Sequence, residues 1–121
     1  MDLEEFDFDY DKENDSLFIF KPNVSSKSSI ELGNFVYDYD GKGQIVGIEI
    51  LSAKETISDT LNHDVSSKFL ENIKDIKVSF KPVKNLMMIK IFISFNPKIL
   101  KDEIISSVQV PNLRNQSPAS C

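Results

Sequence analysis

Residues 86–95 constrain the fold more than any other stretch, because the run is apolar at nearly every position. A strand of this composition needs cover on both faces, whereas a strand with one buried face alternates apolar and polar residues. The alternation of a strand divides the run into two faces, one formed by Met87, Ile89, Ile91, Ile93 and Phe95 and the other by Leu86, Met88 and Phe92. Helices can cover one of these faces. The other requires either a sheet closed into a barrel or contact with another chain.

The rest of the chain carries the signals of short antiparallel strands. Aromatic residues alternate with aspartates over residues 6–10, and apolar runs elsewhere are separated by turn residues such as Asp40-Gly41-Lys42-Gly43. Three hairpins are expected: 6–10 with 16–20, 30–39 with 44–51, and 77–81 with 86–95. The sequence therefore predicts an antiparallel β-meander.

Two segments have helical signals. Ser52-Ala53-Lys54-Glu55 has the form of a capping box, and an apolar stripe at steps of three or four continues to about Asp75, with a possible break at residues 62–64. Asn96-Pro97 precedes a second candidate helix, from Lys98 to about Val108. The predicted fold class is α+β, an antiparallel β-meander with hairpins, packed by one long helix and one short C-terminal helix. We expect residues 1–110 to form a single domain and 111–121 to be a flexible tail.

Charge is distributed unevenly along the 121 residues, whose formal net charge is −5. The first fifteen residues contain eight acids and one lysine. Carboxylates repel phosphate backbones, so the composition disfavours nucleic acid and favours a basic protein partner for an acidic edge that includes Asp7 and Asp9. We expect a cytoplasmic protein without membrane contact, because no apolar run reaches the length of a membrane helix. One Cys and one His cannot form a disulfide or a Cys/His zinc site, and we expect no cofactor.

Residues 10–53 carry a longer pattern. A tyrosine-aspartate turn leads into a first strand, a serine-glutamate pair follows at residues 29–31, and an aspartate-rich hairpin ends on Val46-Gly47-Ile48-Glu49-Ile50-Leu51. In this order the segments resemble the family called domain of unknown function 2283. The resemblance implies a small prokaryotic meander module with no assigned activity, sometimes encoded beside small toxin-like proteins.

Residues 38–49 match part of the pattern of a twelve-residue calcium-binding loop. Counted as twelve residues, it places Asp38 at position 1, Asp40 at position 3 and Glu49 at position 12. Lys42, however, occupies a ligand position, and the flanking residues alternate as strands rather than helices. We therefore interpret the three carboxylates as weak metal candidates in a hairpin, where Asp38 and Asp40 contribute to stability.

Two functions remain open from the sequence. The first is a non-enzymatic protein-interaction module, a homodimer or a small subunit of a complex, that associates through an apolar strand and an acidic N-terminal edge. Its predicted interface residues are Leu86, Met88, Phe92, Asp7 and Asp9. The alternative is a small enzyme or ligand-binding domain with an unrecognised carboxylate-lined site. The sequence contains no catalytic residue with a matched partner, which favours the first function and predicts no catalytic residue.

Overall fold

The computed structural model describes residues 3–62, 64–95 and 103–111. Its elements are β1 (Leu3–Asp11), β2 (Ser16–Phe20), β3 (Ser28–Leu32), β4 (Phe35–Tyr39), β5 (Ile45–Ile50), α1 (Ala53–Leu61), α2 (Ser67–Leu70), β6 (Ile73–Val83), β7 (Leu86–Phe95) and β8 (Glu103–Pro111). All strand pairs are antiparallel, and the sheet order is β3-β4-β5-β2-β1-β6-β7-β8. The α+β class and the antiparallel sheet are confirmed, but a simple meander is not, because β2 pairs with β5 instead of the next strand β3.

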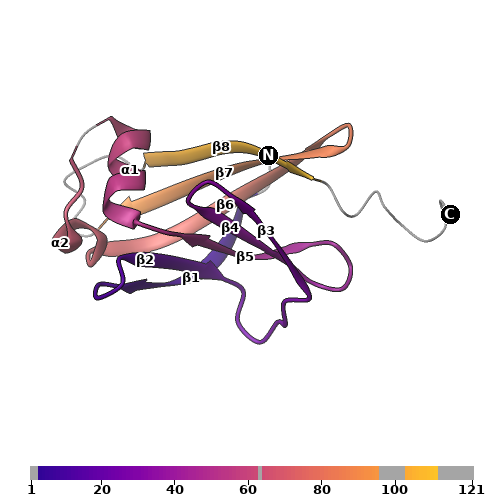
Figure 1. The fold of residues 1–121 in the computed structure, drawn as a ribbon, viewed down its shortest axis with the longest axis horizontal. Helices are drawn as coiled ribbons and strands as arrows, with labels where there is room; N and C mark the ends of the chain where they lie inside the picture. The colour runs from indigo at the N-terminus through magenta and orange to yellow at the C-terminus, as the bar shows by residue number, and fades with distance from the viewer. Residues whose placement is uncertain (1–2, 63, 96–102, 112–121) are drawn as a thin grey trace, which may run out of the picture.

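Strand β1 joins two layers of this sheet. Its first residues, Leu3–Phe6, pair with β6, whereas residues Asp7–Asp11 pair with β2. Figure 1 shows the resulting arrangement, with β1 to β5 in one layer and β6 to β8 in a second layer that crosses it. We call these the β1–β5 layer and the β6–β8 layer.

The two layers bury their inner faces against each other in one hydrophobic core. Leu17 and Ile48 from the β1–β5 layer and Ile76 and Ile91 from the β6–β8 layer are all at most 1% exposed. Helix α1 contacts β8 and contributes the buried Ile57. The Tyr39 hydroxyl donates a 2.9 Å hydrogen bond to the carbonyl of Pro111, which links β4 to the end of β8.

The three expected hairpins are present as β1–β2, β4–β5 and β6–β7. The predicted strand 30–39 is two strands, because the chain turns at Gly33, where φ is +59°. Strand β7 alternates as expected: Ile89, Ile91 and Ile93 are fully buried, and the opposite face is partly exposed.

The long helix is not confirmed. Helix α1 ends at Leu61, with Asn62 in the left-handed region at φ 60°, and the described residues between α1 and β6 contain only one further helical turn, α2. The residues from Ile73 onward belong to β6 instead of extending the helix. Isoleucines at 73 and 76 fit a helical stripe, but their branched side chains suit a strand equally well, and pairing with β1 and β7 decides the outcome.

The predicted capping box is wrong. Ser52 has φ 47° and makes no side-chain cap hydrogen bond. Asp15, in the β1–β2 turn, provides the cap: its carbonyl accepts from the Ala53 amide at 2.8 Å, and its carboxylate accepts from the Lys54 amide at 3.2 Å. A residue distant in sequence thus satisfies the first amides of α1.

The predicted C-terminal helix is also wrong over the part that the structure describes. Residues 103–111 form β8, which pairs with β7 from Leu86↔Pro111 to Ile93↔Glu103. Without β8, the long strand β7 would lie at the sheet edge with unpaired backbone groups. The start of the expected helix, residues 98–102, and the expected tail after residue 111 lie outside the described residues.

Candidate protein-interaction surface

The outer face of the β1–β5 layer carries two rows of side chains in register across the strands. One row runs Asp9, Phe18, Glu49, Val36 and Glu31, and the neighbouring row runs Asp7, Phe20, Gly47, Asp38 and Ser29. We call this surface the acidic face, defined by the five carboxylates of these rows together with Phe18 and Phe20.

Two phenylalanines lie exposed among these carboxylates. Phe18 and Phe20 are each 37% exposed, whereas their neighbours Leu17 and Ile19 are buried in the core. Cross-strand pairing places Asp9 beside Phe18 and Asp7 beside Phe20. Aromatic rings on a surface are a feature of protein interfaces, where they supply large contact areas at low entropic cost.

Gly47 leaves a shallow hollow in the middle of the acidic face. The hollow has a volume of about 380 Å³ and is lined by both phenylalanines and by Asp9, Asp38 and Glu49. A second hollow of about 350 Å³ continues from Phe20 and Asp38 toward Val24, itself 45% exposed. Together they form a groove with apolar walls and carboxylate rims.

Asp38 is held over the glycine. The Ser29 hydroxyl donates a 2.6 Å hydrogen bond to Asp38 Oδ1, and a Cβ at position 47 would lie 2.9 Å from Asp38 Oδ2. Any side chain at position 47 would therefore push the carboxylate aside. The absence of a side chain at Gly47 thus allows the carboxylate to lie over the backbone of β5.

Glu49 lies among other carboxylates on the acidic face. Partial burial raises its pKa above the ordinary glutamate value, and the charges of Asp38 and Glu31 raise it further. Neighbouring carboxylates that raise the pKa of Glu49 create a local negative potential, which an approaching cation would neutralise.

The three weak metal candidates do not converge. Asp40 lies in the β4–β5 turn, where its Oδ1 accepts from the amides of Lys42 at 2.8 Å and Gln44 at 2.9 Å. Asp38 and Glu49 lie on the neighbouring strands β4 and β5, as the hairpin interpretation predicts. Among the described residues, no three Asp, Glu, His or Cys side chains form a group suited to hold an ion.

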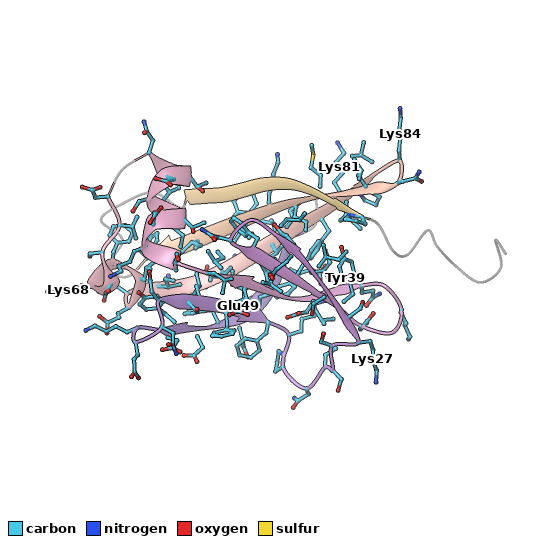
Figure 2. The ribbon with its side chains drawn as sticks, in the orientation of Figure 1. Lys27, Tyr39, Glu49, Lys68, Lys81 and Lys84 are labelled. Atoms are coloured by element: carbon cyan, nitrogen blue, oxygen red, sulfur yellow. The ribbon has the colours of Figure 1, made fainter. Side chains whose placement is uncertain are left out.

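The β6–β8 layer has a different outer face. Register places Lys77 beside Phe92, Ser79 beside Lys90, and Lys81 beside Met88. Lys77 and Lys81 are exposed, and Met88, Lys90 and Phe92 are half-buried. We call this surface the lysine face, defined by these three lysines with Met88 and Phe92. Figure 2 shows Lys81 projecting from this layer, while Glu49 lies on the other layer.

The structure separates the predicted interface residues into two groups. Asp7 and Asp9 lie on the acidic face, whereas Met88 and Phe92 lie on the lysine face, with the 38% exposed Leu86 at its end. Sequence reasoning missed Phe18 and Phe20, because residues 17–20 are apolar throughout and alternation cannot assign their faces. The missing signal was the pairing of Phe18 and Phe20 with the outward Asp9 and Asp7.

Comparisons with known proteins give a family match but no activity for this surface. The family model described as "Protein of unknown function (DUF2283)" matches residues 7–54. An uncharacterised protein of Methanocaldococcus jannaschii is 32% identical over 109 residues, which are 88% of this chain and 90% of that protein. A putative hypoxanthine phosphoribosyltransferase of Methanosarcina mazei is 37% identical over 67 residues, 55% of this chain and half of that protein.

Two further findings bear on structure. No solved structure matches the chain. None of the helices in the described part of the chain is long and apolar enough to cross a membrane.

Proposed function

Since the chain belongs, through residues 7–54, to the domain of unknown function 2283 family, we propose its function from its own surface: it is a non-enzymatic protein-interaction module. Its acidic face binds a basic surface of a protein partner. The observation that carries the proposal is the pair of exposed rings, Phe18 and Phe20, set in register beside Asp9 and Asp7.

The chemistry of this surface suits cationic side chains. A lysine or arginine aliphatic stem packs on an aromatic ring while its charged group bonds a carboxylate, so both parts of the side chain find a partner. The groove over Gly47 offers both: Phe20 forms one wall, and Asp38 and Glu49 supply the charge. Phosphate backbones, by contrast, would be repelled by five carboxylates.

Within the chain, one contact already uses this chemistry. Lys21 lies 5.4 Å from the centre of the Phe6 ring while its ammonium pairs with Glu4 at 2.6 Å. The contact combines a ring, a lysine and a carboxylate, with the Phe6 ring on the buried side of β1. A partner lysine at Phe20 and Asp38 would make the same combination between chains.

The alternative function, a small enzyme or ligand-binding domain, has one observation in its favour. Glu49 has a raised pKa and lies in the hollow with Asp38, and perturbed carboxylates in clefts are candidates for acid-base work. The hollow is shallow and open, however, whereas sites for small molecules enclose most of their ligand. Glu49→Gln separates the two functions, since a surface that binds cations tolerates the loss of one of five carboxylates and a general acid does not.

Zero-length crosslinking with a carbodiimide in a lysate of the source organism tests the proposal, because this reagent joins carboxylates directly to lysines in contact. We expect a stoichiometric partner whose lysines are joined to Asp7, Asp9 or Glu49. Replacing both rings, Phe18→Ser with Phe20→Ser, should abolish the crosslink while the circular dichroism spectrum stays unchanged.

The matched control is Leu32→Ser, which removes another exposed apolar side chain, 40% exposed, at the edge strand β3. This variant should retain the crosslink. Crosslinks that arise only from Glu55 and Asp59 on α1, or that survive removal of both rings, would contradict the proposal.

A further inference from the structure

The lysine face has the chemistry that the acidic face requires of a partner. It presents Lys77, Lys81 and Lys90 around two apolar side chains, Met88 and Phe92. The acidic face presents carboxylates around two apolar side chains, Phe18 and Phe20. Each face therefore combines apolar and charged side chains, with Lys90 between Met88 and Phe92 along β7, and the charges of the two faces are opposite in sign.

The two faces of one molecule cannot meet each other. The inner sides of both layers share one core, so the outer sides point away from each other. Glu5 lies opposite Lys77 on β1, and Asp75 lies opposite Ser94, so both mark the margins of the lysine face. Contact between an acidic face and a lysine face is possible only between two copies.

We infer that the partner of the acidic face is the lysine face of a second copy of this chain. This inference rests on the proposed function, since it identifies the basic surface that the acidic face binds. In the contact, ammonium groups of Lys77 and Lys81 meet carboxylates such as Asp9 and Glu49, while Met88 and Phe92 pack on the exposed phenylalanines. Complementary charge sets the orientation, and the packed apolar side chains exclude water.

Such an interface is heterologous, because it joins two different surfaces. Each copy that binds leaves one acidic face and one lysine face free at the ends of the assembly. Association therefore continues beyond the dimer until a ring closes or the free protein is depleted. A symmetric dimer, by comparison, would use the same surface on both copies and stop at two.

Two charge-reversal variants test the inference by complementation. The first, Asp9→Lys with Glu49→Lys, blocks the acidic face and leaves the lysine face intact. The second, Lys77→Glu with Lys81→Glu, blocks the lysine face and leaves the acidic face intact. Sedimentation velocity at low salt should show species larger than a dimer for the unaltered chain and monomers for each variant alone.

An equal mixture of the two variants should associate again, because the intact lysine face of the first complements the intact acidic face of the second and the two reversed faces are also opposite in charge. Raising the salt from about 0.05 M to about 0.5 M should weaken association of the unaltered chain by about tenfold or more, since the charges are exposed to solvent. Circular dichroism of each variant checks that its fold is intact. Glu55→Lys with Asp59→Lys on α1 is the control pair and should assemble like the unaltered chain.

Three outcomes would overturn the inference: an unaltered chain that stays monomeric at every concentration and salt, a species that stops at a symmetric dimer, or variants that fail to pair when mixed. Failure here is distinguishable from failure of the proposed function. If the chain is monomeric but a different protein is still crosslinked to Asp9 through its lysines, the interaction module survives and self-association does not.

Discussion

The β1–β5 layer and the β6–β8 layer are built from the same alternation of side chains but are fixed differently. In the first layer, aspartates in the turns bond backbone amides: Asp11 accepts from Asn14, Asp15 from Lys54, and Asp40 from Lys42 and Gln44. In the second layer, ten residue pairs join β6 to β7, and β7 buries one complete face. Turn chemistry thus sets the geometry of one layer, and strand length and burial set that of the other.

This difference predicts where each layer is sensitive to substitution. Removing a turn carboxylate should matter in the β1–β5 layer, whereas removing a buried methyl group should matter in both layers, since both contribute fully buried side chains to the core. Because both layers share one core, damage to either should still unfold the whole domain in a single transition.

The largest effect is expected for Ile91→Ala in β7. Ile91 is fully buried, so the substitution should lower the free energy of unfolding by about 3 kcal/mol, measured by urea denaturation. Met88→Ala, on the outer face of the same strand, should cost less than about 1 kcal/mol. Two separate transitions in the Ile91 variant would show that the layers unfold independently of each other.

The second effect concerns Asp15 in the β1–β2 turn. Asp15→Ala removes the acceptor of the Lys54 amide and of the Tyr10 hydroxyl, which lies 2.7 Å away, and should cost about 1 to 2 kcal/mol. Glu13→Ala alters an exposed residue of the same turn and is the control. Equal destabilisation by the two substitutions would show that Asp15 does not stabilise the chain by capping α1.

A smaller effect is expected for Asp40 in the β4–β5 turn. Asp40→Ala leaves the amides of Lys42 and Gln44 without their acceptor and should cost about 1 kcal/mol in thermal or urea unfolding. Asp40→Asn keeps a side-chain oxygen in place and should restore most of the loss. If the asparagine variant is as unstable as the alanine variant, charge rather than turn geometry is responsible.

The smallest effect is expected for Glu49→Gln on the acidic face. Because the pKa of Glu49 is raised in the folded chain, the folded state binds its proton more tightly than the unfolded state does. Ionisation of Glu49 therefore removes stability as the pH rises above the ordinary glutamate pKa. Glu49→Gln should raise the melting temperature slightly at neutral pH, and the gain should vanish at acidic pH.

Glu13→Gln is the matched control for that pH series, since Glu13 is exposed in the β1–β2 turn. A Glu49 variant whose gain persists unchanged at low pH would show that its effect is not electrostatic. This measurement also reports how much the charge of the acidic face destabilises the folded chain.

Local sequence signals predicted the three hairpins and the outward position of some acidic-face residues. The aspartates that alternate with Phe6, Phe8 and Tyr10 placed Asp7 and Asp9 outside, and residues 40–43 gave the β4–β5 turn. In each case the deciding contacts lie close in sequence.

Elements decided by distant contacts were not predictable. Residues 103–108 satisfy a helical pattern, yet their backbone pairs with β7 because that strand otherwise lies at an edge. The cap of α1 comes from Asp15, which no local pattern around Ser52 reveals. The exposure of Phe18 and Phe20 likewise depends on which strands flank β2.

The Asp15 contact also sets a boundary in the chain. Residue 15 and residue 54 are thirty-nine positions apart, and the bond between them closes the intervening strands into a loop fastened at its two ends. The family match ends at residue 54, the residue whose backbone amide donates a hydrogen bond to Asp15. Because Asp15 accepts from the backbone amide of residue 54, this hydrogen bond does not depend on which elements follow that residue. The elements after residue 54 can therefore change while the hydrogen bond is kept.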